Sequence, residues 1–147
     1  MHWTAGFRLG CMLHATGPPP VMSIVRLRNM TEDQFYEIYN RACTENGGPE
    51  PLEGDRALAN MLLGHGYIMN GGLEHFEDLS EEERRQSIAG YRFFGFNEAA
   101  DLLVNSPRIS EEDILAADEQ FTKFDSEMMT KLRSYVDANS HQFRVSR

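Results

Sequence analysis

The sequence predicts an all-α fold: a single compact helical domain of about six to eight helices that ends in a long C-terminal helix. Apolar side chains recur at helical spacing in several segments, and capping boxes open two of these segments. No stretch shows the apolar–polar alternation of a strand. The 147 residues suit one domain with a sizeable core, for which nine Phe, five Tyr and eight Met supply bulky side chains.

The first 21 residues are expected to lie outside that domain. They lack a charged region followed by a clean apolar stretch, so they make a poor signal peptide, and the prolines at 18–20 favour an extended spacer. We expect residues 1–21 to be a poorly ordered extension and residues 22–147 to form the helical domain. Met22 is a second plausible start, so the sequence leaves open whether the extension is native.

The first helix is predicted to begin at the capping box of Thr31 and Gln34. One face of that helix is apolar, formed by Phe35, Ile38, Tyr39 and Ala42. The stretch NGGP at 46–49 should end it, because glycine allows a left-handed cap and proline cannot continue a helix.

A central helix is expected over residues 58–69, where LANMLLGHGYIM is apolar nearly all round, as in a buried helix. Gly64 and Gly66 weaken this helix relative to alanine, and we expect them to permit close packing by a neighbouring element. The Asn-Gly-Gly triplet at 70–72 follows, and LEHF then starts another turn with Leu73 and Phe76 facing inward. Asn and Gly tolerate left-handed backbone at low cost, so the triplet is interpreted as a helix stop and restart.

Three further helices are expected after this corner. Ser80 and Glu83 form a second capping box, NEAADLLVNS is a short helix, and Ser110 with Asp113 opens the last helix. The last helix carries a near-heptad stripe: Ile114, Ala117, Phe121, Phe124, Met128, Leu132 and Tyr135. Such a stripe can be a dimer seam, although it is more often core.

The charge is unevenly distributed. All 23 acidic residues lie between Glu32 and Asp137, and this window holds nine of the 14 basic residues, which gives it a net charge of −14. An acidic body repels nucleic acid and anionic membranes and attracts a basic protein surface. The alternative is that the charge only keeps the domain soluble.

The candidate partner-binding acids cluster at helix starts and on the last helix. At a helix start, acids also stabilise the helix dipole, which is their structural alternative. The candidates are Glu81, Glu82, Glu83, Glu111, Glu112, Asp118 and Glu119.

Catalytic, cofactor and metal sites are not predicted. His65, Glu74 and His75 lack metal-ligand spacing, and Cys43 lacks a motif that would support a nucleophile. The glycines match no phosphate-binding fingerprint. We therefore expect a cytoplasmic, non-enzymatic protein with free thiols at Cys11 and Cys43. The alternative is a small-molecule or enzymatic pocket near the corner, with polar groups from His65, Tyr67, Asn70 and His75.

The stretch NGGLEHF, followed by SIAGYRFFGFNEAADLLVNS, resembles the core of a bacterial family named after a DNA-mimic protein (DMP-like) and catalogued largely as a domain of unknown function. The resemblance covers roughly residues 31–138. The matching positions are Asn70, Gly71, Gly72, Phe76, Gly95, Ala99, Ala100, Leu102 and Leu103. The sequence departs from the pattern at Leu73, at His75 and at Glu77-Asp78.

The resemblance implies an acidic, all-helical domain that forms a homodimer. It also implies surface carboxylates that imitate DNA phosphates and occupy a DNA-binding protein. The expected partner is therefore a basic protein surface, either a transcription factor or, if the domain is an immunity protein, a toxin. No direct contact with nucleic acid or membrane is expected.

Overall fold

The computed structural model describes residues 29–146, so the predicted boundary between residues 21 and 22 lies outside it. The described residues form helices without a strand, which confirms the predicted all-α fold. The elements are α1 (Glu32–Glu45), α2 (Glu53–Gly71), α3 (Leu73–Phe76), α4 (Glu81–Phe93), α5 (Asn97–Asn105), the 3-10 helix η1 (Ser106–Arg108), α6 (Ile114–Ala138) and the 3-10 helix η2 (Ser140–Gln142).

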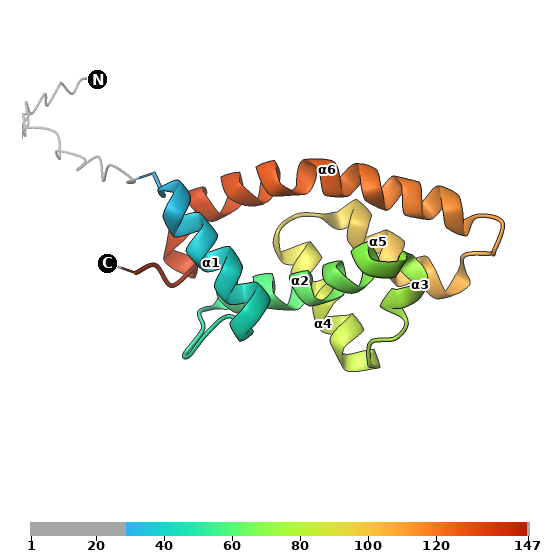
Figure 1. Ribbon diagram of the computed structural model, residues 1–147, viewed down its shortest axis with the longest axis horizontal. Coiled ribbons are helices and arrows are strands. Elements are labelled where there is room, and N and C mark those ends of the chain that lie inside the picture. The colour runs from blue at the N-terminus through green and yellow to red at the C-terminus, as the bar shows by residue number, and fades with distance from the viewer. Residues whose placement is uncertain (1–28, 147) are drawn as a thin grey trace, which may run out of the picture.

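The long helix α6 runs along the whole molecule, with α1 and the C-terminus at one end and α3 at the other (Figure 1). Its stripe is largely core: Ala117, Phe121, Met128 and Leu132 are buried. Ile114, Phe124 and Tyr135 are half-buried against the same core. The chain's own core therefore uses this stripe, and a dimer would need another surface.

The central helix α2 packs closely on α4 because each helix has a glycine where the other helix approaches it: Gly64 on α2 and Gly90 on α4. A Cβ atom on Gly90 would lie 2.6 Å from the carbonyl oxygen of Ala57, and one on Gly64 would collide with Ser87. The expectation that Gly64 allows close packing is confirmed. The same expectation for Gly66 is wrong, because nothing lies within 4 Å of its Cβ position.

The capping boxes at Thr31 and Ser80 are confirmed by reciprocal hydrogen bonds with Gln34 and Glu83. The predicted start of the last helix is wrong by one turn. Ser110 Oγ donates to Asp113 Oδ2 at 2.7 Å, but this pair closes a turn, and α6 begins only at Ile114. The central helix is also longer at both ends than residues 58–69.

A buried ion pair ties α1, the start of α2 and the C-terminal segment together. Asp55 is 1% exposed, and Arg41 Nη2 donates to its Oδ1 at 2.9 Å. The backbone N–H groups of Leu52 and Arg144 both donate to Oδ2 at 3.0 Å. Both oxygen atoms of this carboxylate thus accept hydrogen bonds that join separate segments of the fold.

None of the helices between residues 29 and 146 combines the length and the apolarity that crossing a bilayer requires.

Candidate functional site

The Asn-Gly-Gly triplet lies at the junction of α2 and α3, and only Gly72 needs the conformational freedom of glycine. Asn70 and Gly71 remain in the last turn of α2. Gly72 has φ 80° and ψ −178°, a conformation essentially restricted to glycine, and its N–H donates to the carbonyl of Ile68 at 2.7 Å. The reversal buries Leu73 and Phe76.

Asp118 on α6 completes this corner. Its Oδ1 accepts the N–H of Leu73 at 2.8 Å, so it caps α3, whose own N-cap residue is Gly72 and has no side chain. A Cβ atom on Gly72 would lie 3.0 Å from Oδ2. Asp118, a candidate partner-binding acid, is therefore committed to holding α3 against α6.

Carboxylates from α3, the start of α4 and the turn before α6 meet around η1. They line two adjoining hollows of about 330 and 320 Å³. Glu77 and Pro107 belong to both. We call this surface the η1 patch and define it by Glu74, Glu77, Glu81, Glu111, Val104 and Pro107. Arg84 and Arg85 also line the hollow of about 330 Å³, so the excess of negative charge belongs to the hollow of about 320 Å³, which three carboxylates and no cation line.

Three carboxylates of the η1 patch are available to a partner. Glu77 is taken, because it pairs with Arg84 and accepts a hydrogen bond from Ser106 at 2.9 Å. Glu74, Glu81 and Glu111 are exposed and have no ion-pair partner within residues 29–146. Two of the predicted acids, Glu81 and Glu111, thus reach one surface from separate elements. Glu74, which joins them, was considered in the sequence only as a metal ligand.

The remaining predicted acids divide into paired and free groups. Glu82 pairs with Arg85. Glu83 closes the capping box, and hydrogen bonds from the Ser80 side chain and backbone lower the pKa of its carboxyl group. Glu112 and Glu119 are exposed.

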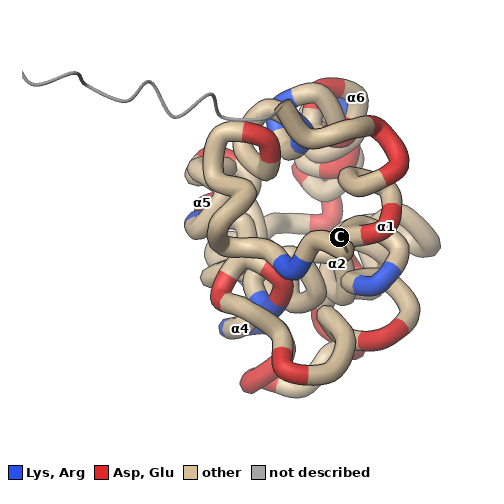
Figure 2. The backbone as a smooth tube through the Cα atoms, turned by 90° about the vertical axis from the view of Figure 1, so that its left-hand side faces the viewer, with Lys and Arg blue, Asp and Glu red and all other residues tan. Residues whose placement is uncertain are grey.

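Seen from the end of the molecule, acidic positions occur on several sides of the backbone, as Figure 2 shows. The acids therefore do not form one continuous row. Their local gathering at the η1 patch is the feature that distinguishes this surface.

A buried polar network connects α2, α4 and α6. His65 Nε2 donates to Asp125 Oδ1 at 2.8 Å, and its Nδ1 accepts the hydroxyl of Tyr91 at 3.0 Å. Burial lowers the pKa of His65, an effect that the Asp125 carboxylate opposes. Burial and the same carboxylate raise the pKa of Tyr91 well above its ordinary value. Both polar atoms of the imidazole are satisfied, so the network serves as an internal tie.

The structure does not assemble the alternative pocket near the corner. His65 points inward to Tyr91 and Asp125, whereas Tyr67, Asn70 and His75 are exposed. The four polar groups named for that pocket therefore do not converge.

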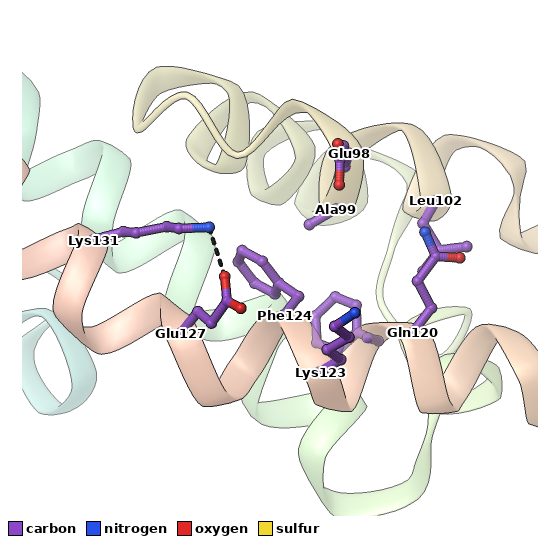
Figure 3. A pocket seen from close by; sticks show the side chains of 9 residues that line it. Glu98, Ala99, Leu102, Gln120, Lys123, Phe124, Glu127 and Lys131 are labelled. Carbon is purple, nitrogen blue, oxygen red and sulfur yellow. Dashed lines mark hydrogen bonds and ion pairs between the residues drawn. The ribbon is translucent and has the colours of Figure 1, made fainter.

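A different hollow, of about 230 Å³, lies between α5 and α6. Figure 3 shows the Phe124 ring between the two helices, and Lys131 Nζ bound to Glu127 at 2.8 Å. Lys123 and Glu98 also line this hollow. With two cationic and two anionic side chains, it has no net charge that would select an ionic ligand.

No group of three or more His, Cys, Asp or Glu side chains within residues 29–146 is arranged to hold a metal ion. Cys43 is an exposed free thiol, and Cys11 lies outside the described residues.

No family model matches the chain, and neither the curated proteins nor the solved structures contain a match. The resemblance to the DMP-like family therefore stays a prediction.

Proposed function

We propose that this protein is an acidic, non-enzymatic interaction module that binds a basic protein surface through the η1 patch. The observation that carries the proposal is the convergence of Glu74, Glu81 and Glu111 from three separate elements onto adjoining hollows. Exposed carboxylates without internal partners keep their full charge for a partner's Lys or Arg side chains.

Apolar surface between these acids supports the same proposal. Val104 is 46% exposed and lines the hollow of about 330 Å³ together with Pro107, which also lines the second hollow. Interfaces combine a small apolar centre with a polar rim. The partner segment would therefore carry basic residues around at least one apolar side chain.

The class of partner is a basic DNA-binding protein or a basic toxin. Imitation of DNA requires carboxylates in rows that match a duplex, which carries about one charge per 1.7 Å of axis. The distribution of acids over several sides favours a local patch over a copy of the whole duplex (Figure 2). The proposal therefore needs electrostatic recognition but not a duplex-like shape.

A triple variant tests the proposal. The full chain with Glu74→Gln, Glu81→Gln and Glu111→Gln is immobilised beside the wild type, and lysate proteins are bound at low salt and eluted with a salt gradient. A matched control carries Glu32→Gln, Asp33→Asn and Glu45→Gln, three exposed acids on α1. We expect a basic protein that the wild type and the control retain and the patch variant loses.

Purified partner then allows direct titration at several salt concentrations. The affinity should fall steeply with salt, because the screening length shrinks to about 10 Å at 0.1 M. The proposal would be contradicted if the patch variant bound the partner as strongly as the wild type. It would also be contradicted if the affinity did not change with salt concentration.

A further inference from the structure

A hollow of about 490 Å³ opens where the described chain begins. Its floor is apolar, with Met30 8% exposed, Phe143 3% exposed and Val145 half-buried. Asn29 lies on its edge. The preceding residues 1–28 therefore enter the domain at the rim of this hollow.

The entry point is firmly held. The backbone N–H of Met30 donates to Asp137 Oδ1 at 2.6 Å, and Thr31 caps α1 directly afterwards. The ring of Phe143 packs directly against Gly54 of α2, so closely that a Cβ atom on Gly54 would lie 2.7 Å from it. The apolar floor of the hollow and the point where the preceding chain is attached are therefore held in fixed positions relative to each other.

The chain before Asn29 matches this hollow in polarity and charge. Residues 21–28, VMSIVRLR, contain five apolar side chains and two arginines, and residues 1–28 contain no acid. Residues 29–146 hold all 23 acidic side chains and ten of the 14 basic ones. Glu32 and Asp33, exposed on the first turn of α1, lie beside the lining residues Thr31 and Gln34.

We propose that residues 21–28 dock into this hollow of their own chain, with Val25 and Leu27 on the apolar floor. In an extended segment, alternate side chains point to opposite sides, so Arg26 and Arg28 would then point away from the apolar floor. Tethering supplies an effective concentration of about 1 mM. A dissociation constant ten times smaller than this concentration gives a docked population about ten times larger than the open one.

Hydrogen exchange of the full chain, read by mass spectrometry on peptides, tests this proposal. We expect residues 23–28 to exchange about tenfold more slowly than an unstructured chain, and residues 2–12 of the same molecule to show no such protection. Val25→Ser with Leu27→Ser should abolish the difference. Leu9→Ser with Leu13→Ser is the matched control and should leave it intact. In both variants, exchange within α2 and α4 should stay at the wild-type rate.

Three outcomes would overturn the proposal. Exchange of residues 23–28 at the unstructured rate would show that the hollow is not occupied. Protection that survives the Val25/Leu27 double substitution would exclude the proposed contact. Protection that disappears on a roughly hundredfold dilution would assign the hollow to the segment of a second copy. The test does not involve the η1 patch, so its outcome is separate from that of the proposed partner binding.

Discussion

A single glycine sets the direction of the chain between α2 and α3. Gly72→Ala should lower the free energy of unfolding by about 1–3 kcal/mol, because φ 80° with ψ −178° strains any residue that has a Cβ atom. Gly66→Ala is the control within the same helix. It adds a Cβ in open space at a helical position and should stabilise the protein by about 0.5–1 kcal/mol. Urea unfolding followed by circular dichroism measures both, and equal effects would contradict the assignment of the turn to Gly72.

His65 should make stability depend on pH. Its pKa is lower in the folded chain than the ordinary value near 6.5, so the unfolded chain takes up a proton first as the pH falls. The free energy of unfolding should therefore be highest above about pH 7 and decrease towards pH 5. This window stays above the ordinary pKa values of carboxyl groups, near 4.

Two substitutions isolate the contribution of His65. His65→Gln should flatten the dependence between about pH 7 and pH 5, and cost roughly 1–3 kcal/mol at pH 7 because the buried partners are less well satisfied. His141→Gln, at an exposed position, should retain the wild-type profile. Urea midpoints at closely spaced pH values measure this, and an unchanged slope in His65→Gln would contradict the assignment.

At the scale of elements, the sequence predicted the features that depend on residues close together in the chain and missed those that depend on residues far apart. The capping boxes at Thr31 and Ser80 involve residues three apart, so their signal is local and was readable. Asp118 and Asp125 meet partners 45 and 60 residues away, and no local pattern reveals such a partner. One signal was present: both acids lie beside Phe121, within the apolar stripe, where an acid needs a partner.

The candidate site was predictable to a similar degree. Glu81 and Glu111 could be selected as acids at helix starts, but their meeting around η1 depends on how α3, α5 and α6 pack. The same packing brings in Glu74, which no sequence feature marked as a partner-binding acid.

Substitution of Asp55 should lower the free energy of unfolding strongly, because this carboxylate joins α1, the start of α2 and the C-terminal segment. Asp55→Ala leaves Arg41, whose side chain is 15% exposed, without its closest carboxylate partner and removes the acceptor for two backbone N–H groups. Breaking a buried pair from one side costs about 3–5 kcal/mol. Glu53→Ala, an exposed acid two residues earlier, should cost less than about 1 kcal/mol. Thermal and urea unfolding compare the two; similar small losses would show that the Asp55 contacts do not hold this end together.

At the scale of the whole molecule, the acidic residues divide into two kinds. Asp55, Asp118, Asp125 and Asp137 each accept a hydrogen bond that joins distant segments, so part of the negative charge is internal structure. The exposed acids repel one another, and the compact state bears this repulsion more than the unfolded chain does. The negative surface charge therefore lowers the free energy of unfolding of this protein.

This destabilisation predicts how charge substitutions respond to salt. The double variant Glu45→Gln, Glu119→Gln removes two exposed acids that lie outside the first turn of a helix. It should be more stable than the wild type at about 10 mM salt, by several tenths of a kcal/mol, and the gain should vanish near 0.5 M, where screening is nearly complete. Lys123→Gln removes an exposed cation that has no ion pair among the described residues, so it should have the opposite sign and the same salt response. Urea unfolding over a salt series measures both. A double variant that is less stable than the wild type at low salt would mean that repulsion among the exposed acids does not lower the stability of the folded chain.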